Sequence, residues 1–176
     1  DAACLWRAAG KPAHFEAVCP QQFEAPLAPP QAARAAGANV DSQLLRTGVD
    51  YWRECSDIVL VEGVGGLMSP LSDEDFVADL AYEFGFPLVV VVPNQLGVIN
   101  QTLQTLITAV TFREGISVAG IVLNHCRPPQ SEDVSIETNR QAISHYAVPP
   151  VVAEVSWQGH FDVKVDWWEL ASSSHR

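Results

Sequence analysis

The sequence predicts an α/β protein with a mostly parallel sheet flanked by helices. Four short apolar runs stand out, at residues 58–61, 88–92, 118–123 and 151–155. The first three lack polar alternation and are rich in β-branched residues, which is typical of parallel strands covered on both faces. Apolar residues at helical spacing lie between the runs, so strand and helix alternate as in α/β folds.

Helices are expected on both sides of these runs. The segments before the first run with helical patterns are 2–9, 31–36 and 42–54, and the Pro-rich stretch 20–30 is expected to be irregular. The segments between and after the runs are 76–84, 103–110 and 136–146. Asp133 is a candidate cap for the last of these, and the acidic residues 73–75 are expected to form the N-terminus of the first. We expect a single domain, residues 1–176.

Composition narrows the class of partner. The formal charge is −11 and the pI is near 4.7, which argues against nucleic acid because phosphate backbones need a basic surface. No apolar run approaches the length of a membrane span, so a membrane partner is not expected either. An enzyme for small anions requires local donors that overcome the overall negative field.

The cysteines give a prediction about compartment. Cys4, Cys19, Cys55 and Cys126 are scattered without a CxxC pair. A zinc site or a disulfide framework is therefore not expected, and the reducing cytoplasm is the predicted location. The chain begins at Asp1 without an initiator Met, so we expect either a processed protein or a fragment.

Candidate site residues follow the ends of the runs, where ligands gather on parallel sheets. Glu62 is followed by glycines, a pattern that holds Mg²⁺ and lets backbone approach phosphates, although a solvated turn fits equally well. The backbone N–H groups of 97–100 open a helix and suit a carboxylate or phosphate, or only a capped helix start. Asn124 has the donor and acceptor for a purine edge, and Trp157 either flanks a base or covers the core.

Taken together in their order along the chain, these strand-end motifs resemble those of the dethiobiotin synthetase family. The similarity rests on 61–66 followed by Pro70-Leu71, then 96–100, Asn124 and 154–157, with an upstream loop from Cys19-Pro20 to Ala28-Pro29. It extends from Asp1 to about Trp157. It implies a P-loop NTPase-like fold and an ATP- and Mg²⁺-dependent ligase of biotin biosynthesis. The substrates would be 7,8-diaminononanoate and CO₂, and the enzyme would be a homodimer.

The resemblance also implies residue roles. Metal ligands would be Glu62 and Asp1, and the nucleotide phosphates would lie along Glu62, Gly63, Val64 and Gly65. The base would be bound by Asn124, Ser156, Trp157 and Gln158. The substrate carboxylate would be held across the dimer interface by Gly97, Val98, Ile99 and Asn100.

The chain also departs from the family pattern. It contains no GxxxxGK[ST] sequence, and its lysines, Lys11 and Lys164, do not follow a glycine-rich strand turn. The family's first strand and P-loop are thus missing here, no catalytic residue is assigned, and the chain alone is expected to be inactive. His125 stands where many members carry Asp, and Ile136 lies near a position that is aromatic in others. Two alternatives remain: a non-catalytic nucleotide- or partner-binding module of the same fold, or a relative of the cobyrinate-amidating enzymes.

Overall fold

The computed structural model describes residues 1–128 and 133–172, and it resolves the chain into two compact units, Asp1–Leu80 and Ala81–Arg176. The division falls within helix α6 (Val77–Phe84). Among the described residues, no helix is both long enough and apolar enough to cross a membrane.

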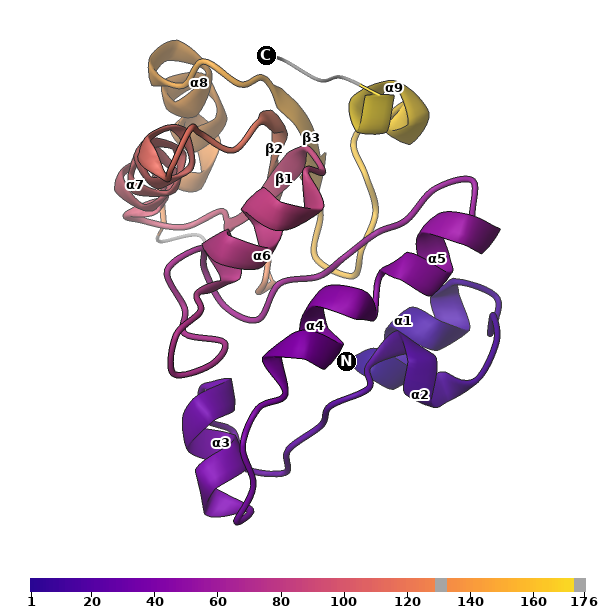
Figure 1. Cartoon of the computed structure of the whole chain (residues 1–176). Helices are drawn as coiled ribbons and strands as arrows, with labels where there is room; N and C mark the ends of the chain where they lie inside the picture. Colours follow the sequence, from indigo (N-terminus) through magenta and orange to yellow (C-terminus); the bar gives the residue numbers. More distant parts are fainter. Residues whose placement is uncertain (129–132, 173–176) are drawn as a thin grey trace. The chain divides into compact units, whose positions relative to one another are not determined.

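The first unit is built from short helices joined by irregular segments (Figure 1). They are α1 (Ala2–Ala8), α2 (Phe15–Val18), α3 (Pro29–Ala35), α4 (Ser42–Thr47) and α5 (Asp50–Cys55). Local chemistry explains where they begin, because Pro29 and Pro30 occupy the first turn of α3, and the Asp41 carboxylate accepts the Leu44 N–H at 2.9 Å to cap α4. The helix expected over 42–54 is two helices, since α4 ends at Gly48.

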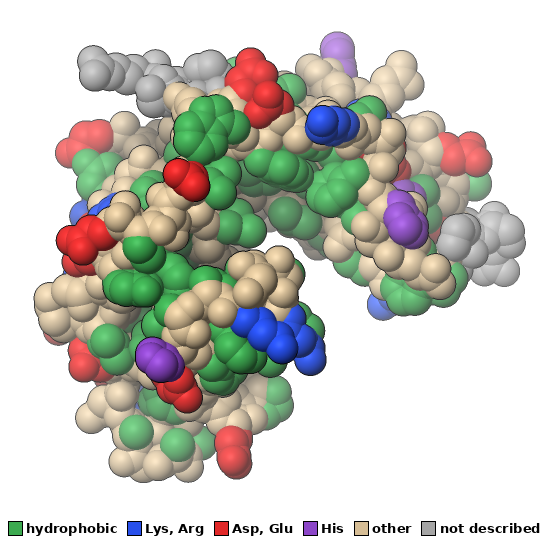
Figure 2. Space-filling view, turned by 90° about the vertical axis from the view of Figure 1, so that its right-hand side faces the viewer, with side chains coloured by type: hydrophobic (Ala, Val, Ile, Leu, Met, Phe, Trp, Pro, Cys, Tyr) green, Lys and Arg blue, Asp and Glu red, His purple; other side chains and the backbone are tan. Residues whose placement is uncertain are grey.

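The strand expected at 58–61 is not present. These residues have no regular secondary structure, and Ile58, Leu60 and Val61 are 50%, 87% and 48% exposed. A β-branched segment becomes a strand only when another strand satisfies its N–H and C=O groups, and no described strand pairs with this one. Apolar side chains reach the surface in several other places as well, as the space-filling view shows (Figure 2).

The acidic residues 73–75 form a loop and do not open α6, which corrects the expectation above. An isolated bridge joins Pro70 to Phe76 across this loop. The Asp75 carboxylate receives hydrogen bonds from Arg46 at 2.6 Å and from the Ser72 hydroxyl at 2.8 Å, and 12% of its side chain is exposed. The Arg46 hydrogen bond, aided by Ser72, lowers the pKa of Asp75 to about 2 against the opposing effect of burial.

The second unit contains a three-stranded parallel sheet in the order β1-β2-β3 (Figure 1). The strands are β1 (Leu88–Pro93), β2 (Val118–Asn124) and β3 (Val151–Val155), which confirms three of the four predicted runs. Gly120 permits close contact between β2 and β3, because a Cβ there would lie 2.6 Å from a methyl group of Val152. β1 is an edge strand, and its Val91 is 61% exposed.

Two helices of this unit, α7 (Val98–Thr111) and α8 (Ile136–Tyr146), lie beside one another in Figure 1, and they contact β1 and β3 respectively. The core between the helices and the sheet is formed by Val90, Val92, Val98, Ile121, Leu123 and Ile143. A last helix, α9 (Trp167–Ser172), contacts β2. Its first-turn amide at Glu169 donates to Asp166 at 2.9 Å.

The N-cap of α8 is Ser135 and not Asp133, contrary to the expectation from sequence. The Asp133 carboxylate instead accepts from the Ser135 amide at 3.0 Å and from its hydroxyl at 2.5 Å. The hydroxyl hydrogen bond lowers the pKa of Asp133. Asp133 therefore orders the residue that precedes the helix.

We predict that Asp75→Asn lowers the free energy of unfolding at neutral pH by about 1 kcal/mol, because the Arg46 guanidinium loses an ionised partner. A lowered folded-state pKa stabilises the protein above the carboxyl group's unfolded pKa, and this contribution is lost as the pH falls towards about 2. Urea unfolding at pH 7 and at successively lower pH measures the difference between the two proteins. A difference that stays constant as the pH falls from 5 to 2 would contradict this assignment.

Candidate functional site

The carboxyl edge of the sheet gathers polar residues from three strands. The parallel register pairs Pro93 of β1 with Asn124 of β2, and Asn124 with Val155 of β3, so the three strands end level with one another. The backbone amide of Asn94 donates to the carbonyl of Asn124 at 2.8 Å, and that of His125 donates to Val155 at 2.8 Å. The residues just beyond the strands are thereby held together, as expected of a ligand site on such a sheet.

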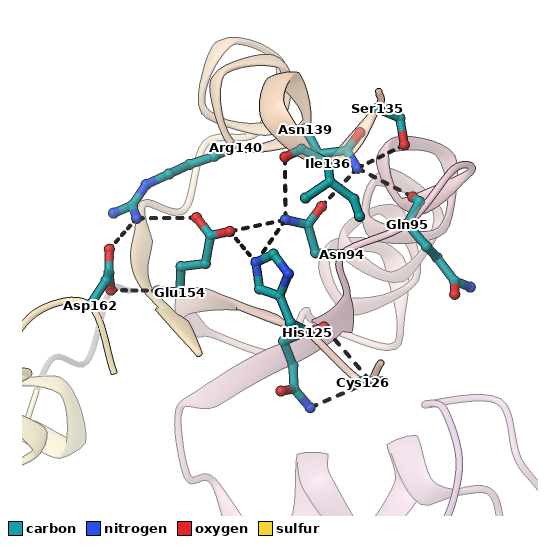
Figure 3. A network of polar contacts seen from close by, with 11 residues as sticks. Asn94, Gln95, His125, Cys126, Ser135, Ile136, Asn139, Arg140, Glu154 and Asp162 are labelled. Atoms are coloured by element: carbon teal, nitrogen blue, oxygen red, sulfur yellow. Dashed lines mark hydrogen bonds and ion pairs between the residues drawn. The ribbon is translucent and has the colours of Figure 1, made fainter. Parts of the chain in front are cut away.

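Asn94 lies at the centre of a polar network at this edge (Figure 3). Its side chain is buried, with Asn94 only 6% exposed. The Nδ2 group donates to Glu154 Oε1 at 3.0 Å and lies 3.3 Å from His125 Nε2, while Oδ1 accepts from Asn139 Nδ2 at 2.8 Å. One asparagine thus connects β1, β2, β3 and α8.

Glu154 joins this network to two further charged residues. Its Oε1 lies 2.5 Å from His125 Nε2, and its Oε2 lies 3.6 Å from Arg140 Nη1. Arg140 also pairs with Asp162, whose carboxylate accepts the Glu154 backbone N–H at 2.7 Å. That backbone hydrogen bond, aided by Arg140, lowers the pKa of Asp162 against a smaller effect of burial. The cluster therefore contains two carboxylates and one guanidinium, with the His125 ring against Glu154 (Figure 3).

A tight hairpin follows β3 and forms one wall of a pocket. The amide of Ser156 donates to His160 at 2.8 Å, an isolated bridge joins Val155 to Phe161, and Gln158 adopts a positive φ of 81°. The pocket beside the hairpin has a volume of about 280 Å³. It is lined by His125, Glu154, Ser156, His160, Phe161 and Asp162.

The residues proposed from sequence for the base only partly line this pocket. Ser156 does so, whereas Asn124, Trp157 and Gln158 belong to the adjoining strand end and hairpin without lining it. Sequence reasoning noted His125 only as a departure from the family pattern and gave no role to the side chains of Glu154, His160, Phe161 and Asp162. The signal available for Glu154 was a single carboxylate within an otherwise apolar strand, VVAEV.

The start of α7 is the second feature of this edge. Gly97 precedes the helix with φ 95°, a left-handed conformation that glycine adopts without strain. Val98 is fully buried, whereas Gly97 and Asn100 are exposed. The first-turn N–H groups of Ile99 and Asn100 have no partner within an α-helix, and they are available to an anion together with the helix dipole. The four predicted residues thus do form a helix N-terminus.

The remaining proposed residues lie in the first unit. Glu62 is exposed in an irregular segment and not at a strand end, because 58–61 is not a strand. Gly65 has φ 77°, and a Cβ there would lie 2.3 Å from Ser69 Oγ, so this turn requires glycine. Asp1 is exposed at the start of α1, where its carbonyl accepts from Cys4 and Leu5. Among the described residues, no group of three His, Cys, Asp or Glu side chains is placed to hold a metal ion.

The first unit also has a pocket, of about 170 Å³. Its lining residues are Pro30, Arg34, Asn39, Val40, Ser42, Ser72, Asp73 and Glu74. None of them was proposed from sequence, and Arg34 and Asp73 within it form an ion pair with each other.

Comparisons with known proteins identify relatives of this chain. A family model described as an AAA domain matches residues 1–163. The ATP-dependent dethiobiotin synthetase of Rhodopirellula baltica is 41% identical over 165 residues, which cover 88% of this chain and 63% of that protein. The proteins of the same name from Anaeromyxobacter dehalogenans strain 2CP-C and Crocosphaera subtropica are 37% and 32% identical. They are matched over 90% and 91% of this chain, and over 69% and 72% of their own length.

A parallel sheet flanked by helices, together with the AAA-domain match, defines an α/β domain of the P-loop NTPase class. Within that class, the chain belongs to the dethiobiotin synthetase family. The resemblance seen in the sequence is confirmed. The chain spans 63% of the length of the Rhodopirellula relative.

We predict that Gly97→Ala destabilises the protein by about 1 kcal/mol, because alanine is strained at a positive φ. The matched control is Gly66→Ala, since neither position has a heavy atom within 4 Å of an added Cβ and only Gly97 has a positive φ. Thermal unfolding followed by circular dichroism measures both. Equal effects of the two substitutions would contradict the conformational explanation.

Proposed function

We propose that this chain is the greater part of a dethiobiotin synthetase that uses ATP and Mg²⁺ to join 7,8-diaminononanoate with CO₂. Residues 1–176 would form one domain of that enzyme. The observation that carries the proposal is a pocket at the ends of β2 and β3, on a sheet edge where β1 also ends and leads into α7, in a chain that belongs to this family.

The pocket beside the hairpin is proposed to hold the adenine. A volume of about 280 Å³ accommodates a purine, and Phe161 offers an aromatic face of the kind on which bases stack. Ser156 and His160 provide hydrogen-bonding groups at its wall. Asn124, at the end of β2, and Trp157 and Gln158, in the hairpin, would close around the base when it binds.

The proposed metal ligand is Glu62, with Asp1 as a second carboxylate. Mg²⁺ is commonly held by one or two carboxylates together with substrate phosphates and water, so it needs no preformed cluster of side chains. Glu62 is exposed, so its carboxylate is accessible to such an ion. Bound there, Mg²⁺ would neutralise charge on the transferring phosphoryl group. The backbone of Gly63, Val64 and Gly65 would lie along the phosphates.

The helix N-terminus at Gly97, Val98, Ile99 and Asn100 is proposed to bind the substrate carboxylate. Its N–H groups and dipole contribute typically about 0.3–1 kcal/mol beyond the hydrogen bonds themselves, without need of a lysine. One amine of the substrate would capture CO₂ as a carbamate. The γ-phosphoryl of ATP would transfer to that carbamate, and the second amine would then displace phosphate to close the ureido ring. This leaves ADP and phosphate.

We further propose a homodimer in the reducing cytoplasm. On α7, Ile107 and Val110 are 60% and 70% exposed, and Leu96 just before the helix is 80% exposed. Apolar side chains at this spacing on one helix are typical of a surface covered by a partner. All four cysteines are unpaired, which suits a reducing compartment.

Turnover tests the proposal. We expect the 176-residue chain to form no dethiobiotin from ATP, CO₂ and the diamine, because it contains no P-loop lysine to stabilise the developing phosphate charge. A longer protein, in which a relative's P-loop segment precedes Asp1, should be active. In that protein Glu62→Gln should lower kcat by about a hundredfold.

The control for this experiment is Glu54→Gln, an exposed glutamate on α5 that has no proposed role. Robust turnover by the 176 residues alone would show that other groups bind the phosphates. An unchanged kcat in Glu62→Gln would reject Glu62 as the metal ligand. A longer protein that binds nucleotide without turnover would favour the non-catalytic module.

The dimer is tested on α7. We expect Ile107→Glu to shift the protein from dimer to monomer, because a charge would be buried in the apolar contact without a partner. Gln101→Glu, exposed on the same helix but turned away from Ile107 and Val110, should leave the dimer intact. Sedimentation equilibrium distinguishes the two states. A wild-type monomer, or a dimer in the Ile107→Glu variant, would contradict the proposed interface.

A further inference from the structure

The segment 94–97 between β1 and α7 is held by side chains from outside it. The carbonyl of Gln95 accepts the Val98 N–H at 3.1 Å, which begins the turn into α7, and it also accepts Asn139 Nδ2 of α8 at 3.3 Å. Asn139 is 3% exposed, so the donor of this second hydrogen bond is buried, whereas Gln95 is exposed. The direction in which α7 begins is therefore fixed from α8 as well as from the strand.

Asn139 in turn depends on Asn94. Its Nδ2 group donates to Asn94 Oδ1 at 2.8 Å, and the Asn94 Nδ2 group is directed at Glu154 Oε1 at 3.0 Å. Two adjacent primary amides can each rotate by half a turn, which exchanges donor and acceptor. Glu154 removes that freedom for Asn94, because a carboxylate only accepts hydrogen bonds, and the longer contact of Asn94 Nδ2 with the Ile136 carbonyl, at 3.4 Å, favours the same orientation.

Glu154 also reaches the pocket. Its side chain is 24% exposed, and it lines the same pocket as His125 and Ser156. A continuous series of contacts thus runs from the pocket wall through Glu154, Asn94 and Asn139 to the carbonyl of Gln95, as Figure 3 shows. These are hydrogen bonds between buried or half-buried groups, in which a missing partner is costly.

We propose that Glu154 and Asn94 are positioning residues, which hold the N-terminus of α7 in place relative to the pocket at the carboxyl edge of the sheet. The role of this placement in substrate binding rests on the proposed carboxylate site at Gly97–Asn100, whereas the placement of the helix itself does not depend on that site. Glu154 sets the orientation of the Asn94 amide, Asn94 sets that of Asn139, and Asn139 holds the segment from which the helix starts.

Four variants separate positioning from general stability. Asn94→Asp puts a second carboxylate oxygen opposite Glu154 without altering the pocket lining, and Glu154→Ala removes the acceptor. Glu154→Gln keeps an oxygen that can accept from Asn94 but also gains a donor, so it should restore the placement only in part. Glu137→Ala removes an exposed glutamate from the first turn of α8 and is the matched control.

Amide hydrogen exchange in the full 176-residue chain, followed by NMR, gives the primary readout. The reporters are the amides of Val98 and Gln101, which donate to Gln95 and Gly97, and the reference is the Ile121 amide in the core of the sheet. In Asn94→Asp and Glu154→Ala, we expect protection at the reporters to fall about tenfold relative to Ile121. A fall of this size corresponds to the loss of one charge-assisted hydrogen bond. Glu154→Gln should show a smaller fall than Glu154→Ala, and Glu137→Ala should match the wild type.

The inference is overturned by an equal fall at Ile121, by unchanged protection in Asn94→Asp, or by a fall in Glu154→Gln as large as that in Glu154→Ala. Calorimetry with 7,8-diaminononanoate then tests whether the placement of α7 affects binding of this substrate. Asn94→Asp should weaken its binding about tenfold while leaving ATP binding unchanged. If the wild-type chain bound no diamine, the proposed carboxylate site would fail, and the exchange experiment would still decide whether Glu154 and Asn94 position α7.

Discussion

The parallel register of three strands is the constraint on which the rest of this site depends. Because Pro93, Asn124 and Val155 are paired across β1, β2 and β3, the first residues after the strands must lie together. The core beneath them, including the fully buried Ile121 and Leu123, holds that register, since a shift of one residue would turn these side chains to the opposite face. Asn94, His125 and Glu154 then meet without any further long-range contact.

A chain with a formal charge of −11 has to bind anionic ligands by local means. Arg140 contributes little free positive charge, because it is already paired with Asp162 and close to Glu154. Backbone N–H groups at the start of α7 are donors of the kind that such binding requires, because they carry no counterion and cost no side-chain entropy. The hydrogen-bonded residues around Glu154 lie in the same unit and include Asn139, which contacts the segment before α7.

The sequence was sufficient for the three strands that pair with one another and insufficient for the fourth run. Residues 88–92, 118–123 and 151–155 have both strand propensity and partners, whereas 58–61 has the propensity and no described partner. The helix N-terminus at Gly97 was also predictable, because glycine and helical periodicity are local signals. The network around Asn94 was not, since hydrogen bonds between residues 45 and 60 positions apart leave no local pattern. Ser156, which lines the pocket, was proposed through the family resemblance, whereas Glu154 and His160 were given no role.

The most direct test of a nucleotide site at the carboxyl edge is an NMR titration of the 176-residue chain with ATP, which requires no turnover. The account predicts saturable shifts of the backbone amides of His125, Ser156, His160 and Phe161, with the residues around the pocket of the first unit unaffected. Saturable shifts confined to Arg34, Asn39 and Ser72, or no saturable shift at the hairpin after β3, would contradict it.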